Sequence, residues 1–182
     1  MMTLAVLSTS SGAGSTTLAA TAFAGLRGSP VGAPTLLGTD RGGLVERAGG
    51  DEVHAVNPRA AIWDAGVHTP NAAAEVLASG ECHLVVVAPA TDLGVADARA
   101  FVDAASALGD PRLMERVSLV LNQVYRRTSP RSTTVLLGLP LIRVPWAAAL
   151  ATPGPAPSPG SLPRKARTAV EGWMHHAATA LS

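Results

Sequence analysis

The sequence predicts an α/β fold: a doubly wound, mainly parallel sheet with helices on both faces. The first observation behind this prediction is that apolar runs of strand length alternate with longer segments of helical period. The second is that 47% of the 182 residues are hydrophobic and 15% are charged, which suits a compact domain and not a disordered chain. We expect this domain to span residues 1–150.

Six short apolar runs have the length and composition of buried strands. They cover residues 4–7, 35–38, 60–63, 84–88, 117–121 and 141–144. Three helices are expected between these strands, at residues 16–26, 71–78 and 94–108. Each helix joins two strands, as the right-handed crossovers of a parallel sheet require.

The composition changes after the last predicted strand. Residues 151–161 are rich in proline and glycine and predict an extended connector. Residues 162–182 have apolar side chains at helical spacing and predict an amphipathic helix packed on the same domain. A membrane-binding helix needs a similar stripe, but this stripe is rich in alanine and contains one tryptophan, so we expect packing and no peripheral membrane contact.

Composition and charge exclude several classes of function. The net charge of +1 gives no overall attraction to nucleic acid or anionic lipid. Cys82 is the one cysteine, so neither an intrachain disulfide nor a cysteine metal site is expected. No apolar run reaches the roughly 20 residues that span a bilayer. Together these features favour a cytoplasmic protein, and the use of arginine in place of lysine almost throughout indicates a GC-rich genome.

Residues 10–17, Ser-Ser-Gly-Ala-Gly-Ser-Thr-Thr, follow the first predicted strand and open the first helix. A strand, a glycine turn and a helix start form a phosphate cradle, because backbone N–H groups and the helix N-terminus attract anions. The expected contacts come from Gly12, Ala13, Gly14, Ser15, Thr16 and Thr17. Phosphate loops carry a lysine directly before the first threonine, and this chain has Ser15 there. Its one lysine is Lys165, near the end of the chain.

These features, taken in order, resemble the deviant-Walker P-loop family of MinD and ParA from residue 2 to about residue 150. In the loop, Ser10 and Ser15 occupy the two lysine positions, and Thr16 stands where the family has its magnesium-binding hydroxyl. Asp40 ends the second strand segment and matches one of the family's two aspartates there. Asp64 matches the Walker B aspartate. The resemblance therefore implies a magnesium site at Thr16, Asp40 and Asp64.

The remaining motifs lie at the ends of later strands. Asn122 follows residues 117–121 and resembles the asparagine that contacts adenine in the family. The sequence Pro-Leu-Ile-Arg-Val-Pro-Trp at 140–146 resembles the turn after the family's last strand. The segment between Asp40 and residue 60 is short, where active members usually carry helices. We therefore expect a reduced switch region and dimer face.

The missing lysines determine the functional expectation. A charge-assisted hydrogen bond contributes about 1.5–3 kcal/mol, so each lost lysine weakens triphosphate binding on the order of 10- to 100-fold. The resemblance then implies a pseudo-ATPase that acts as a localisation or scaffold subunit through protein contacts. Nucleotide would be absent or weakly bound as ATP or ADP with magnesium, and a homodimer is plausible. The alternatives are an active or ATP-switched ATPase dimer and a DNA-associated partition protein.

Several of these residues have both a functional and a structural interpretation. An arginine can replace the lysine, and the candidates are Arg27, Arg41, Arg47 and Arg59. The glycines can instead serve a tight turn, with Ser15 or Thr16 capping the helix. Asp64 can equally cap neighbouring N–H groups, and Asn122 can close its own turn.

A group of arginines, Arg126, Arg127 and Arg131, lies in one predicted loop. In character it resembles the surface arginines by which partition proteins of this family hold DNA without reading its sequence. Phosphate binding usually needs more charges on one face. A solvated loop is therefore favoured over a contact with nucleic acid or with an acidic partner.

Overall fold

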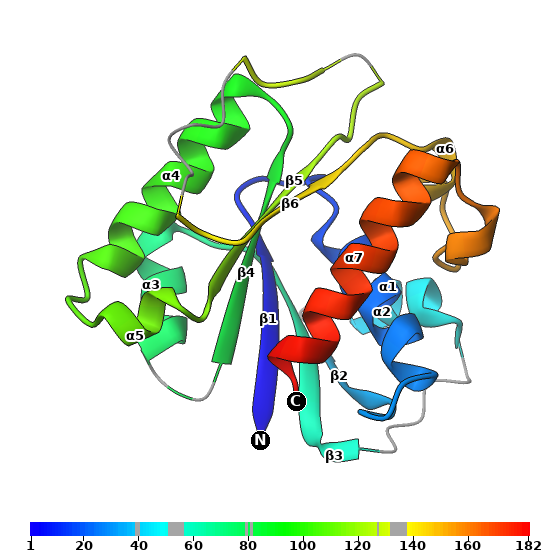
Figure 1. Cartoon of the computed structure of the whole chain (residues 1–182), viewed down its shortest axis with the longest axis horizontal. Helices are drawn as coiled ribbons and strands as arrows, with labels where there is room; N and C mark the ends of the chain where they lie inside the picture. Colours follow the sequence, from blue (N-terminus) through cyan, green and yellow to red (C-terminus); the bar gives the residue numbers. More distant parts are fainter. Residues whose placement is uncertain (39–40, 51–56, 79, 81, 127, 132–137) are drawn as a thin grey trace.

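The computed structural model describes residues 1–38, 41–50, 57–78, 80, 82–126, 128–131 and 138–182, with the backbone alone for residues 41 and 42. Asp40 and Arg127 lie outside the described residues. The described chain forms an α/β fold around one six-stranded sheet, in which helices lie on both sides of the strands (Figure 1).

All strand pairings in this sheet are parallel, and the strand order is β2-β3-β1-β4-β5-β6. The strands are β1 (Met2–Ser8), β2 (Pro34–Gly38), β3 (Asn57–Val67), β4 (Cys82–Pro89), β5 (Val117–Asn122) and β6 (Leu141–Val144). Each predicted strand is confirmed, and β3 is several residues longer than expected. In the centre, Val6 lies opposite Asp64 of β3 and Val85 of β4. The ends of β1, β3 and β5 therefore meet at one edge of the sheet.

The helices divide the core into two layers. One face carries α1 (Ser15–Arg27), α2 (Arg41–Ala48) and α7 (Arg164–Ala180), and the other carries α3 (Pro70–Ala78), α4 (Asp92–Ser106) and the short α5 (Pro111–Met114). Alternate residues of β1 point to opposite faces, so Leu4 and Val6 join the first layer whereas Ala5 and Leu7 join the second. The predicted double covering of the sheet is confirmed.

Helix α2 lies in the segment where the sequence predicts little structure. Its start contains Gly42 and Gly43, and glycine is a poor helix former. The helix is nevertheless placed by packing, because Leu44 is fully buried in the layer that also contains α1. Local propensity is here overridden by burial of one leucine.

The C-terminal helix α7 packs against α1. Trp173 is fully buried, and its Nε1 donates a hydrogen bond of 2.9 Å to the carbonyl oxygen of Leu18. Ala166, Val170 and Ala177 continue the same buried stripe. The apolar face of this helix is thus covered by the domain.

The connector before α7 is less extended than its proline content predicts. It contains the 3-10 turn η3 (Pro159–Ser161), and the short helix α6 (Ala148–Ala151) ends at its first residue. Among the described residues, no helix has both the length and the apolar character needed to cross a membrane.

Candidate functional site

The loop between β1 and α1 is fixed by the end of β5. Gly12 and Gly14 have positive φ angles of 76° and 95°, a conformation that favours glycine. The side-chain Nδ2 of Asn122 donates a hydrogen bond of 2.8 Å to the carbonyl oxygen of Ala13. A Cβ atom on residue 14 would lie 2.4 Å from that same Nδ2. Asn122 therefore holds the loop after β1 in place. Its side chain bonds across to this loop, whereas the structural interpretation from the sequence had it close its own turn.

Helix α1 begins without a side-chain cap. Gly14 is the N-cap residue and no side chain bonds to the first turn, so the expectation that Ser15 or Thr16 caps the helix is wrong. Within the described part of the chain, the backbone N–H groups of residues 14–17 have no hydrogen-bond acceptor. These N–H groups and the helix dipole form a site that favours an anion. Ser15, the first residue of α1, is 6% exposed and brings no charge to this site.

The structure brings Thr16 and Asp64 together. The Oγ1 of Thr16 donates a hydrogen bond of 2.5 Å to Oδ2 of Asp64, which lies on β3 and is 5% exposed. The backbone N–H of Gly66 donates to Oδ1 of Asp64 at 3.4 Å. Asp64 thus accepts from a backbone N–H, as one interpretation predicts, and also contacts the hydroxyl that the other interpretation requires.

A hydroxyl beside a carboxylate fits the way proteins hold Mg²⁺, which uses one or two carboxylates and leaves other positions to water and phosphate oxygens. Thr16 and Asp64 are the residues that would hold such an ion. In the part of the chain that the structure describes, no group of three or more His, Cys, Asp or Glu residues is placed to bind a metal. A magnesium ion here would therefore depend on a phosphate ligand.

Arg47 is the arginine that the structure places beside the loop. Its Nε and one terminal nitrogen donate to Oγ1 of Thr17 at 3.3 and 3.0 Å. The two terminal nitrogens also donate to the carbonyl oxygens of Leu150, Thr152 and Gly154. A guanidinium has five N–H donors, and these contacts account for all of them.

The other candidate arginines are remote or outside the description. Arg27 is the last residue of α1, about 18 Å from the helix start at 1.5 Å per residue. Arg59 lies at the amino end of β3, at the opposite edge of the sheet. The side chain of Arg41 lies outside the described residues.

A cavity of about 390 Å³ opens against the loop. One wall contains the loop glycines, Thr16 and Arg47, and the other wall is mainly apolar and includes Trp146 and Leu150. Burial lowers the pKa of the Arg47 guanidinium, and the nearby Glu46 opposes this effect; the group stays charged at neutral pH. The cavity volume falls within the range of small-molecule sites, so its polar and apolar walls suit a ligand with an anionic end.

The apolar wall is the part of this site that sequence reasoning missed. It is formed by residues that follow β6, among them Pro145, Trp146 and Ala147. The available signal was a tryptophan two residues after the strand that ends at the carboxyl edge of the sheet. Its position against the loop depends on the neighbouring strand order, which the sequence does not state.

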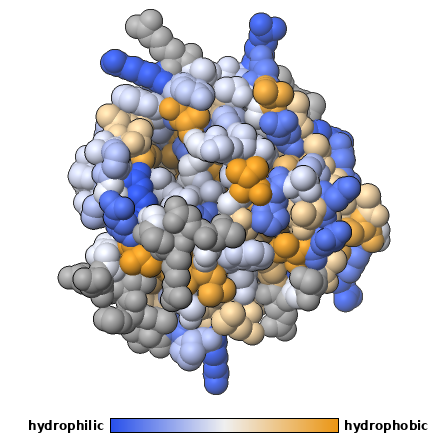
Figure 2. Space-filling model, turned by 180° about the vertical axis from the view of Figure 1, so that it is seen from behind, coloured by the Kyte–Doolittle hydropathy of each residue, from blue (hydrophilic) through white to orange (hydrophobic). Residues whose placement is uncertain are grey.

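Of the arginines in the loop after β5, the structure describes Arg126 and Arg131, and these two have different neighbours. The guanidinium of Arg126 lies over the ring of Trp146, 5.7 Å from the ring centroid. Arg131 forms an ion pair of 3.4 Å with Asp92, whose Oδ1 also accepts from the Arg131 backbone N–H. Asp92 thus offsets the charge of Arg131. Figure 2 shows one face of the molecule, on which hydrophilic and hydrophobic residues are interspersed.

Comparisons of the chain with models of protein families, with curated proteins and with solved structures found no match. What the structure establishes is therefore an α/β domain with an all-parallel sheet and a loop-centred cavity at the carboxyl edge.

Proposed function

We propose that this chain is a degenerate MinD/ParA-like domain, a pseudo-ATPase that serves as a localisation or scaffold subunit through protein contacts. It binds nucleotide weakly or not at all. The observation that carries the proposal is that the N–H donors of Arg47 are all used in hydrogen bonds within the chain. Arg47 is the cation nearest the loop among the described residues, and all its N–H donors are engaged with Thr17 and the connector.

The chemical argument concerns charge in the transition state. Phosphoryl transfer is catalysed by positioning and by cations that stabilise the developing negative charge, and an arginine finger accelerates it about 10³- to 10⁵-fold. Ser10 and Ser15 supply hydroxyls and no charge. Arg47 adds a positive field to the cavity, but a phosphate would have to displace its hydrogen bonds to contact it. Fast hydrolysis is therefore disfavoured.

The rest of the loop has the geometry of a phosphate site, and this is why a loss of function within the family explains it better than an unrelated turn. Gly14 lies so close to Asn122 that a Cβ would not fit between them, and Thr16 donates a hydrogen bond to Asp64. We propose that the retained fold presents surfaces to protein partners in the cytoplasm, including a second copy of the chain.

ATP turnover by the purified full chain tests this proposal. We expect phosphate release at the level of a buffer blank, with wild type and Asp64→Ala indistinguishable. Turnover at ordinary ATPase rates that Asp64→Ala abolishes would overturn the proposal. Circular dichroism of both proteins ensures that the variant is folded.

A second candidate is an ATP-switched dimer, which the Thr16–Asp64 contact and the open N–H groups of the first helical turn favour. In this case magnesium and ATP together shift the chain from monomer to dimer. Light scattering after size-exclusion chromatography, with and without ATP and magnesium, separates the two candidates. The scaffold proposal predicts the same mass in both buffers.

A further inference from the structure

A second cavity, of about 340 Å³, lies at the same carboxyl edge of the sheet but on the face covered by α3 and α4. It is lined by Thr9 after β1, by residues 67–70, which run from the end of β3 to the start of α3, and by Asp97 and Phe101 of α4. Neither the phosphate loop glycines nor Arg47 line it. It is therefore separate from the cavity described above.

Two polar atoms in the residues that line this cavity have no partner. Oγ1 of Thr9 and Nδ1 of His68 are buried and form no hydrogen bond in the described structure. Buried polar atoms are normally paired, and leaving them unpaired costs free energy. Both side chains line the cavity, and we infer that a change of side-chain rotamer on binding turns these atoms toward the ligand. A bound group with N–H donors would recover the missing hydrogen bonds.

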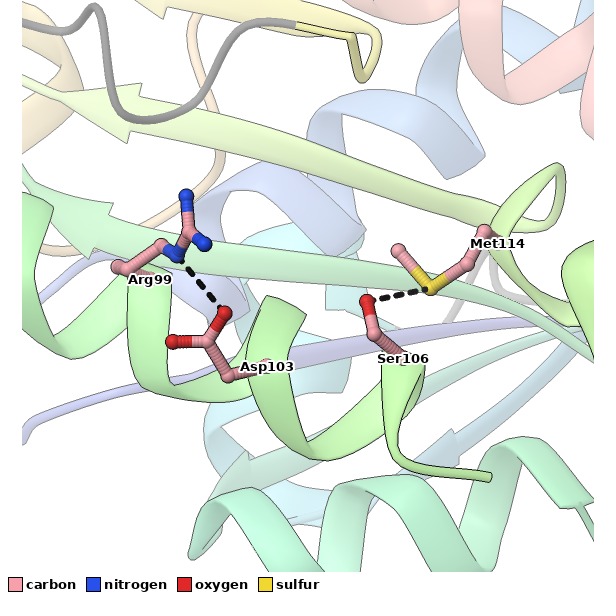
Figure 3. A network of polar contacts seen from close by, with 4 residues as sticks. All are labelled: Arg99, Asp103, Ser106 and Met114. Atoms are coloured by element: carbon pink, nitrogen blue, oxygen red, sulfur yellow. Dashed lines mark hydrogen bonds and ion pairs between the residues drawn. The ribbon is translucent and has the colours of Figure 1, made fainter. Parts of the chain in front are cut away.

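The charge of the cavity comes from Asp97. Within the described part of the chain its carboxylate forms no hydrogen bond or ion pair. Two other acids of the same helix form ion pairs. Asp103 pairs with Arg99 at 2.8 Å (Figure 3), and Asp92 pairs with Arg131. An imidazole nitrogen that carries no proton and a threonine hydroxyl can each accept a hydrogen bond beside this carboxylate. The three acceptors together suit a cation.

One exposed apolar side chain lines the cavity, and another lies one helical turn from Asp97 on α4. Val67 is 56% exposed and lines the cavity, and Leu93 is 72% exposed. Leu93 and Asp97 are four residues apart on α4, so they lie on the same helix face. A surface with an unpaired acid and exposed apolar side chains suits a polypeptide in which a basic residue lies between apolar residues. The aliphatic stem of the basic residue and its apolar neighbours would then contact Val67 and Leu93.

We propose that this cavity receives an arginine or lysine side chain of a protein partner, with Asp97 as its counterion, Thr9 and His68 as further acceptors, and Val67 and Leu93 as apolar contacts around it. The inference rests on the proposed role of the chain as a protein scaffold. It names the chemistry by which one partner is held.

The test is a titration followed by ¹H–¹⁵N NMR of the full chain. The first probe is an acetylated, amidated heptapeptide, Gly-Leu-Val-Arg-Leu-Val-Gly, and its matched control has citrulline in place of arginine. The second probe is N-acetyl-arginine amide, which has the guanidinium without the apolar neighbours. We expect the heptapeptide to shift the signals of Thr9, His68 and Asp97. The citrulline peptide should bind about tenfold or more weakly, because a charge-assisted hydrogen bond is lost.

Variants test the residues. Asp97→Asn should weaken the heptapeptide about tenfold or more, whereas Asp103→Asn, on the same helix, should leave binding unchanged. Leu93→Ser should weaken the heptapeptide and leave N-acetyl-arginine amide unaffected. The melting temperature of each variant shows that it is folded.

Absence of shifts at the cavity with both probes would overturn the inference. So would equal affinity for the heptapeptide and N-acetyl-arginine amide, since a free small cation would then be the better ligand. ATP turnover on the same preparation keeps the two proposals apart. A chain that hydrolyses ATP and binds the peptide contradicts only the proposed function. A chain inert to ATP that ignores the peptide contradicts only this inference.

Discussion

Gly14 and Asn122 approach so closely that no side chain fits between them. Nδ2 of Asn122 lies 2.4 Å from the position a Cβ on residue 14 would take, and it donates to the carbonyl oxygen of Ala13 at 2.8 Å. The end of β5 is thereby coupled to the loop after β1. This contact fixes the conformation of the loop between β1 and α1.

Gly14→Ala should destabilise the fold more than Gly12→Ala. Both residues have positive φ, which costs an alanine about 1–2 kcal/mol, but a Cβ on residue 12 meets nothing within 4 Å. We expect a further loss of roughly 1–3 kcal/mol for Gly14→Ala, because Asn122 must move. Urea unfolding measures both free energies, and equal losses would contradict the contact.

Thr16→Val should lower the free energy of unfolding by about 1–3 kcal/mol, since Asp64 is buried and loses a donor. Thr179→Val serves as the control, because its hydroxyl bonds to a backbone carbonyl on an exposed part of α7. A double-mutant cycle of Thr16→Val and Asp64→Asn should give a coupling energy of at least about 0.5 kcal/mol. Additive losses would show that the two side chains act independently.

Arg47→Met should destabilise the chain by roughly 2–4 kcal/mol, because the connector carbonyls and Thr17 lose their donors. Arg47→Lys keeps the charge but has fewer donors in another geometry, so we expect it to recover less than half of the loss. The exposed Arg164 supplies the control as Arg164→Met. Limited proteolysis should cut residues 151–157 faster in Arg47→Met, and an unchanged rate would refute the anchoring role.

Stability should fall as the pH decreases below about 6.5, the ordinary pKa of histidine. Burial lowers the pKa of His83, with a further effect of Arg116, and burial lowers the pKa of His176, with further effects of His83 and His175. Below pH 6.5 the unfolded chain therefore binds more protons at these histidines than the folded chain does. The free energy of unfolding is highest above pH 6.5 and falls as the pH decreases below it.

Urea midpoints at pH 7.5 and pH 5.5 measure this effect. The double variant His83→Gln and His176→Gln should show a smaller drop between the two values than wild type. If the drop is the same in both proteins, other groups cause it.

The sequence predicts the sheet well because each strand is a short apolar run, and parallel strands in α/β folds are buried on both faces. It also places Thr16 and Asp64 at one edge, since both follow from strand ends. Helix α2 was not predicted because Gly42 and Gly43 at its start have low helix propensity. Its position depends on the burial of Leu44. Local patterns carry no information about such a tertiary contact.

The site contacts that span the chain were the least predictable. Arg47 was one of four equal candidates until the structure placed Leu150, Thr152 and Gly154 around it. The sequence does not predict that Asp97 and His68 line one cavity, because nothing in their spacing indicates it. Both cases depend on how loops fold back over the sheet edge, which motif spacing does not encode.

The melting temperature with and without 1 mM ATP and magnesium tests the central claim most directly. If the site binds nucleotide at millimolar affinity or weaker, mass action adds at most about 0.4 kcal/mol, a shift below about 2 °C for a chain of this size. The account predicts a shift of that size or none, in wild type and Asp64→Ala alike. A ligand at 100 times its dissociation constant adds about 2.7 kcal/mol and raises the melting temperature by roughly 5–10 °C. A shift of that size, lost in Asp64→Ala, would contradict the account and establish a working nucleotide site.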